Sequence, residues 1–116
     1  MKNPITSALS TWFVLPVVLS MFPLMALAVD ADAAQALAKK NDCFKCHAID
    51  KDKKGPSYKK IAAKYQGKSE GEDKIIKNVT TGPKVKLDDG TEEDHKVINT
   101  KDPAALSNLA KWILSQ

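Results

Sequence analysis

Two cysteines followed directly by a histidine constrain this chain more than any other feature of its sequence. Residues 43–47 read C-F-K-C-H, and Cys43 and Cys46 are the only cysteines among the 116 residues. Two thiols at this spacing, with an imidazole beside the second, form thioether bonds to one haem while the histidine binds its iron. We therefore expect Cys43 and Cys46 to carry one covalent haem c, with His47 as the proximal iron ligand.

Two other chemistries use the same residue types. A redox disulfide between Cys43 and Cys46 is typical of a thioredoxin-like βαβ context, which the helical pattern of this chain lacks. A closed zinc site needs four ligands, and Cys43, Cys46, His47 and His95 are the only cysteines and histidines. The adjacent residues Cys46 and His47 suit one zinc ion poorly, because Cys2His2 sites usually show H-x3–5-H spacing. The pattern favours haem attachment.

The first 28 residues differ in composition from the rest of the chain. Lys2 is their only charged residue, an apolar run extends over residues 12–28, and residues 26–28 read A-L-A. A positive start, an apolar core and a small-x-small site are typical of a secretory signal peptide. We expect cleavage after Ala28, which leaves a periplasmic domain of residues 29–116. The alternative is a retained membrane anchor, because the apolar run approaches the ~20 residues that span a bilayer.

Composition narrows the functional classes. Lysine and arginine number 18 against 14 acidic residues, and 28% charged with 43% hydrophobic residues is typical of a folded domain. All 18 basic residues are lysine, which argues against nucleic-acid binding, because such proteins rely on the arginine fork. Removal of the leader leaves 88 of the 116 residues. A domain of that size has only a marginally stable core unless something further, such as a bound cofactor, stabilises it.

The mature region predicts an all-α fold with four helices. Their start signals are, in chain order, Asp30 or Asp32, Ser57, an S-E-G-E capping box at residues 69–72, and Asp102 followed by Pro103. The first helix is expected to bury Ala33, Leu37 and Phe44 on one face, and Gly67 to end the second. Residues 80–101 show no helical period, and the turn signal at Asp89 and Gly90 allows a short hairpin there.

Three segments resemble a known family: residues 43–50 (CFKCHAID), 55–65 (GPSYKKIAAKY) and 109–116 (LAKWILSQ). On these, the chain resembles the class I c-type cytochromes, particularly the small bacterial cytochrome c8 (c551-like) branch, over nearly all of residues 29–116. The resemblance implies the class I cytochrome c fold, in which the first and last helices cross beside one covalently bound haem. The contacts then expected across that crossing are those of Leu37 and Phe44 with Leu109, Trp112 and Ile113.

The resemblance also implies a role for Pro56, whose carbonyl matches the one that accepts a hydrogen bond from the proximal imidazole. Such a bond would fix the ring and raise its basicity. The same G-P pair is equally compatible with an ordinary turn before a helix.

The distal methionine of that family is missing here. The three methionines are Met1, Met21 and Met25, all in the leader. Alignment on Asn99 and the last helix places the methionine position at Lys96, beside His95. We expect His95 to be the distal ligand; Lys96, which must lose a proton to bind metal, is the second candidate, and an open site is the third. Methionine raises the reduction potential of a haem relative to nitrogen ligands. We therefore expect the reduction potential of this protein to lie below that of ordinary members of the family.

The resemblance implies a monohaem electron carrier and not an enzyme. We expect it to be monomeric or weakly associating, with no membrane contact after cleavage. Eight lysines lie in or near the haem-attachment segment (residues 43–47): Lys39, Lys40, Lys45, Lys51, Lys53, Lys54, Lys59 and Lys60. They would steer an acidic redox partner to the haem edge, unless they serve only solubility. Two alternatives stay open. One is a haem-based sensor, in which a labile distal ligand leaves the iron and a small gas binds in its place. The distal loop favours this, because it has little apolar material to hold the ligand. The other is a cytochrome subunit of a periplasmic dehydrogenase.

Overall fold

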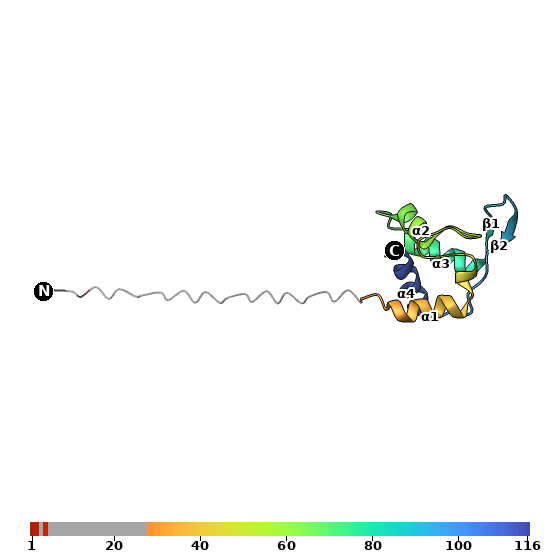
Figure 1. The fold of residues 1–116 in the computed structure, drawn as a ribbon. Helices are drawn as coiled ribbons and strands as arrows, with labels where there is room; N and C mark the ends of the chain where they lie inside the picture. Colours follow the sequence, from red (N-terminus) through yellow and green to blue (C-terminus); the bar gives the residue numbers. More distant parts are fainter. Residues whose placement is uncertain (3, 5–27) are drawn as a thin grey trace.

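A computed structural model describes residues 1–2, 4 and 28–116, so most of the predicted signal peptide lies outside the described residues. The described part contains four α-helices, one 3-10 turn and one hairpin (Figure 1): α1 (Ala31–Lys40), η1 (Cys43–Lys45), α2 (Tyr58–Tyr65), α3 (Gly71–Thr81), β1 (Lys84–Lys86), β2 (Glu92–Asp94) and α4 (Pro103–Leu114). The prediction of an all-α fold is confirmed. None of these described helices has both the length and the apolar character that crossing a membrane requires.

Three of the four predicted helix starts are confirmed by their caps. The side chains of Asp30, Ser57 and Asp102 each accept a backbone N–H from the first turn of α1, α2 and α4. Pro103 occupies the first turn of α4, where its missing N–H leaves no bond unmade. Gly67, just after α2, has φ +73°, the left-handed conformation that commonly ends a helix.

The predicted capping box at residues 69–72 is wrong. Helix α3 begins at Gly71, and Glu70 before it already has helical dihedral angles and makes no capping hydrogen bond through its side chain. The Glu72 carboxylate, which a capping box would turn back onto the chain, instead accepts the hydroxyl of Ser107 in α4. The Glu72 side chain therefore bonds between helices α3 and α4 and not within the predicted capping box.

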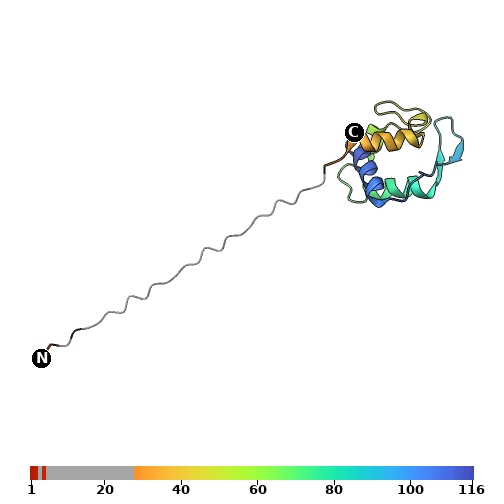
Figure 2. The ribbon, with the colours of Figure 1, turned by 90° about the horizontal axis from the view of Figure 1, so that it is seen from below.

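The buried face of α1 is only partly the predicted one, because Leu37 packs against the core but Ala33 does not. Ala34 and Ala38 are 1% and 0% exposed, whereas Ala33 is exposed and Phe44 lies beyond the helix in η1. Helix α1 packs across α4, whose Ala110 is also 0% exposed, and the crossing is plain in Figure 2. Small side chains at such a crossing let two helix backbones approach closely, which favours alanine there over the larger residues of the predicted stripe.

The contact predicted between the attachment segment and the last helix is present. The ring centroids of Phe44 and Trp112 lie 6.4 Å apart, edge to face. The Tyr58 ring packs against both, with its centroid 5.9 Å from that of Phe44 and 5.3 Å from that of Trp112. Leu109 and Ile113 of α4 are buried in the same core, against which Leu37 and Phe44 are partly buried. Three aromatic rings from separate segments therefore join η1, α2 and α4.

The hairpin forms where a turn signal allowed one. Strands β1 and β2 pair antiparallel, with Lys84 opposite Asp94 and Lys86 opposite Glu92. Gly90, in the connection, has φ +86°, which explains the glycine there. In Figure 2, α1, α4, α3 and the hairpin follow one another around a frame, with the hairpin on the side opposite α4.

The helix crossing predicts a contrast between two alanines of α1. Ala38→Leu adds bulk to a fully buried position and should lower the free energy of unfolding by about 1–3 kcal/mol. Ala36→Leu, at an exposed position of the same helix, should change it by less than about 0.5 kcal/mol. Chemical denaturation of both holoproteins measures this, and equal effects would contradict close packing at the crossing.

Candidate haem site

A cavity of about 750 Å³ opens inside the frame. Residues of η1, of all helices except α1, and of the hairpin line it, which brings together segments far apart in sequence. All six candidate site residues line it: Cys43, Cys46, His47, Pro56, His95 and Lys96. A volume of this size lies within the range of cofactor pockets, which is about 300–1,000 Å³.

The two cysteines lie in a separate turn and not at the end of the first helix as predicted. Asn41 ends α1, Asp42 adopts a left-handed conformation (φ 58°), and Cys43 then opens η1. The Cys43 and Cys46 thiols are free and half-buried on the cavity wall. Burial raises the pKa of the Cys43 thiol. The left-handed residue redirects the chain, so that both thiols face the cavity.

The His47 ring is held from three sides. Its Nδ1 donates to the Pro56 carbonyl oxygen over 2.7 Å, and the ring stacks on Tyr58 with centroids 5.4 Å apart. A side chain at Gly55 would place its Cβ 2.7 Å from the Cε1 atom of the ring, so only glycine fits. Burial lowers the pKa of His47, which favours the neutral imidazole that binds metal ions. The Nε2 atom is left as the free ring nitrogen.

His95 also lines the cavity and comes directly after β2. Its backbone N–H donates to the Pro83 carbonyl over 2.9 Å, and its Nδ1 lies 3.0 Å from the Lys96 carbonyl oxygen. Gly82 lies so close that a Cβ there would come within 2.8 Å of the His95 carbonyl oxygen. The end of α3 therefore positions the backbone of His95, and its Nε2 is also left free.

The two imidazoles lie close together on the wall of the cavity. Their ring centroids are 6.2 Å apart, and the ring planes are inclined by 40°. The Lys96 ammonium lies elsewhere, because it donates to the Asp42 carboxylate over 2.9 Å. Together with Lys45, it lowers the pKa of the Asp42 carboxyl. The structure brings His47 and His95 together and directs the Lys96 side chain to an ion pair.

The zinc alternative finds no support in this arrangement. Across residues 1–2, 4 and 28–116, no three histidine, cysteine, aspartate or glutamate side chains gather closely enough to hold a metal ion. The four residues that a zinc site would have used are therefore spread along the cavity wall and do not converge on one point.

Several features of the site were not predicted. Tyr58 behind His47 and the glycines at positions 55 and 82 act through three-dimensional contacts that sequence spacing does not reveal. The expectation that the distal loop offers little apolar material is wrong, because Val85 and Leu87 are half-buried and line the cavity. The weak alternation of residues 84–87 was the signal for this, since alternate strand residues point to the same face.

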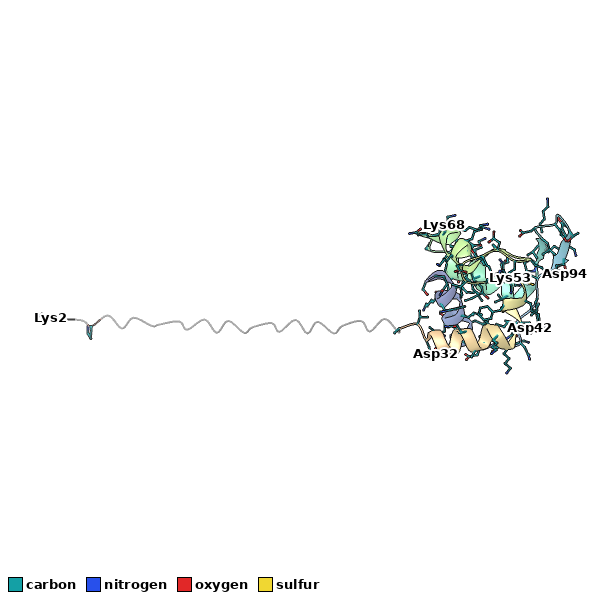
Figure 3. The ribbon with its side chains drawn as sticks, viewed as in Figure 1. Lys2, Asp32, Asp42, Lys53, Lys68 and Asp94 are labelled. Atoms are coloured by element: carbon teal, nitrogen blue, oxygen red, sulfur yellow. The ribbon has the colours of Figure 1, made fainter. Side chains whose placement is uncertain are left out.

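The lysines around the attachment segment are all exposed. Two of the eight, Lys45 and Lys60, line the cavity mouth, where they form ion pairs with Asp42 and Asp52. The ammonium of Lys53, labelled in Figure 3, donates to the Phe44 carbonyl. Part of the predicted lysine cluster therefore also stabilises the attachment segment.

Comparison with known proteins supports the assignment that this geometry suggests. The family model described as Cytochrome c matches residues 31–116. The class 1 cytochrome MtoD from Sideroxydans lithotrophicus ES-1 is 60% identical, with a TM-score of 0.73 over 76% of this chain and 97% of that one. Cytochrome c-551 of Pseudomonas aeruginosa is 30% identical, over 80% of this chain and 86% of the relative. Cytochrome c-551 of Allochromatium vinosum is 38% identical, over 53% of this chain and 65% of the relative.

These matches confirm the resemblance to the c551-like branch and the class I fold with its crossed terminal helices. They agree with the cavity, which is lined by a C-x-x-C-H pentad and by the half-buried imidazole of His95. The chain therefore belongs to the cytochrome c family, as a class I c-type electron-transfer protein that carries one covalent haem c.

Proposed function

We propose that this cytochrome is a periplasmic carrier of single electrons whose haem iron is bound by two histidines. Cys43 and Cys46 hold the haem by thioether bonds, His47 is the proximal ligand and His95 the distal one. The haem, when bound, supplies a one-electron couple between ferric and ferrous iron. The signal-peptide pattern of residues 1–28 supports export and the periplasmic location. The protein passes electrons between redox partners and transforms no substrate of its own.

The facing imidazoles carry this proposal. Imidazole nitrogens bind first-row metal ions at about 2.0–2.1 Å, so two of them on one ion, with about 1.1 Å from each nitrogen to its ring centre, place the centroids about 6.3 Å apart. The 6.2 Å between the His47 and His95 centroids agrees with that span. Each Nδ1 lies against a carbonyl oxygen, which leaves both Nε2 atoms as donors. The residues present therefore fit a haem iron with two imidazole ligands.

The ion pair of Lys96 supports His95 over the second candidate. An ammonium that donates to Asp42 is protonated and directed to the attachment turn, whereas a metal ligand must be a free amine. An open distal site is less consistent with a His95 ring that lies half-buried in the cavity.

The residues around His47 prepare it for its role. The hydrogen bond to Pro56 selects the tautomer whose Nε2 is free, and it raises the basicity of the ligand. Gly55 and Tyr58 restrict rotation of the ring. A ligand held in one orientation in both oxidation states keeps structural change on electron transfer small, which suits a carrier.

The two other functions have less support. A gas sensor needs a distal ligand that leaves readily, but Val85 and Leu87 cover the cavity and Pro83 holds the backbone of His95. A permanently bound subunit needs an exposed apolar patch. Among the described residues the exposed large hydrophobic side chains are Met1, Val29 and Val97, which give no sign of one.

Docking is the second part of the proposal. The exposed lysines around the attachment segment, two of which line the cavity, would steer an acidic partner toward the haem edge and favour short-lived complexes. Such steering is screened by salt. The protein needs no self-association for this role, and we propose that it works as a monomer or weakly associating species.

The ligand assignment predicts the effect of a substitution at each of two adjacent positions. His95→Met should raise the reduction potential by on the order of 100 mV, because thioether ligands favour the ferrous state. Lys96→Gln is the control: it removes the amine without supplying a thioether at the position aligned with the family's methionine, and it should leave the potential nearly unchanged. Spectroelectrochemical titration of both holoproteins measures this. A changed potential in the Lys96 variant alone would assign the ligand to Lys96, and no change in either would leave the distal site open.

The carrier and the sensor differ in their absorption spectra. We expect low-spin spectra in both oxidation states, no methionine–iron charge-transfer band in the ferric form, and no immediate change when carbon monoxide is added to the ferrous form. His95→Ala should bind carbon monoxide promptly. If the unaltered protein is high-spin when reduced and binds carbon monoxide at once, it is a gas-binding protein and not a carrier.

The docking proposal predicts a charge effect that depends on position. Lys54 lies beside Lys53 in the sequence, shortly after the attachment segment. Figure 3 shows Lys68 apart from Lys53. Lys54→Glu should slow oxidation by the anionic acceptor hexacyanoferrate(III) about threefold or more at low ionic strength, and the difference should vanish at high salt. Lys68→Glu makes the same change in net charge and should have a smaller effect. Equal slowing by both variants would contradict a localised docking surface.

A further inference from the structure

The loop that carries His95 is held to the rest of the protein on two sides. On one side α3 holds it, through backbone hydrogen bonds from His95 N–H to Pro83 and from Ile98 N–H to Val79. On the other side it meets the turn between α1 and the first cysteine. Figure 3 shows Asp42 of that turn at the end of α1, on the side of the molecule where Asp94 of the hairpin lies.

Asn41 makes the buried half of this second attachment. It is 4% exposed, and its side chain accepts the backbone N–H of Asn99 over 2.7 Å while donating to the Leu37 carbonyl over 2.9 Å. The bond to Asn99 joins residues 58 positions apart in sequence, and the bond to Leu37 ties the same side chain to the end of α1. An amide that is buried and bonded on both ends fixes one geometry, because either bond, if broken, leaves a polar group unsatisfied.

Asp42 makes the exposed half. Its φ of 58° is a left-handed conformation, which glycine adopts freely and aspartate tolerates at some strain. The carboxylate accepts the Lys96 ammonium over 2.9 Å and the Lys45 ammonium at 3.2 Å. Glycine would suit this backbone better, so the carboxylate has a use that offsets the strain, and the partner it reaches is the residue next to His95.

We propose that Asn41 and Asp42 are positioning residues for the distal ligand. Together they form a clamp that holds the loop of residues 95–99 to the attachment turn, so that the turn bearing Cys43 also sets where His95 stands. The same clamp keeps the Lys96 ammonium on Asp42 and away from the cavity centre. This inference rests on the proposed ligation by His95.

The clamp is tested on the full holoprotein by the rate at which ferrous protein binds carbon monoxide, because carbon monoxide binds only when the distal imidazole has left. Asp42→Gly removes the carboxylate but suits the backbone, and Lys96→Gln removes its partner. Each should speed binding about two- to fivefold, the range for an exposed ion pair. The double variant should be no faster than either single one. Asn41→Ala, which removes a buried hydrogen bond, should speed binding about tenfold or more.

Lys45→Gln is the matched control. Lys45 pairs with the same carboxylate but lies in the attachment turn itself, so its loss should leave the carbon monoxide rate unchanged. Asp42→Gly should also keep or raise the denaturation midpoint, because glycine relieves the left-handed strain. If Asp42→Gly binds carbon monoxide faster without a lower denaturation midpoint, the effect comes from the position of His95 and not from a general loosening of the fold.

The results distinguish the clamp from the ligand assignment. If His95→Ala binds carbon monoxide no faster than the unaltered protein, ligation by His95 is wrong and the clamp has no ligand to position. If His95→Ala is fast while Asp42→Gly and Lys96→Gln keep the unaltered rate, His95 is the ligand and the clamp is overturned. Lys45→Gln as fast as Asp42→Gly would also overturn it, since Asp42 would then act only within its own turn.

Discussion

The crossing of α1 over α4 is the contact on which the rest of the molecule depends. Ala38 and Ala110 are both 0% exposed at this crossing, and their small size allows close helix packing. Helix α4 also packs against α2 and α3, so one helix holds the three others in position. Through Trp112, which meets Phe44 and Tyr58, it also positions the turn that bears the cysteines. The haem-binding pentad is thus placed by packing that contains none of its ligands.

The two imidazoles are held in different ways. His47 is held within a local segment, since Pro56 is nine positions away along the chain. The backbone of His95 bonds to Pro83 on the other side of the hairpin, and its neighbours Lys96 and Asn99 bond to Asp42 and Asn41 in the turn after α1. The position of His95 therefore depends on a long-range contact as well as on the hairpin that precedes it.

Features that depend on a few neighbouring residues were predictable from the sequence. The caps at Asp30, Ser57 and Asp102 are right because each bond closes within two or three residues of the cap. The capping box failed because Glu72 bonds to Ser107, 35 positions away, and no local pattern reveals such a partner. The predicted buried face of α1 missed Ala34 and Ala38 for a related reason. Hydrophobicity favours large side chains, whereas a helix crossing selects small ones.

The sequence by itself determined the chemistry of the site. The spacing of Cys43, Cys46 and His47 is a local property of the chain, and the absence of methionine from residues 29–116 left His95, Lys96 or an open site as the distal alternatives. Only the tertiary structure decided which of these two neighbours faces His47. Adjacent residues on a loop point in directions that local geometry leaves free. The His95 backbone N–H bonds to the Pro83 carbonyl, and the Lys96 ammonium bonds to the Asp42 carboxylate, 54 positions away, so the imidazole lies beside His47 while the ammonium is held in an ion pair.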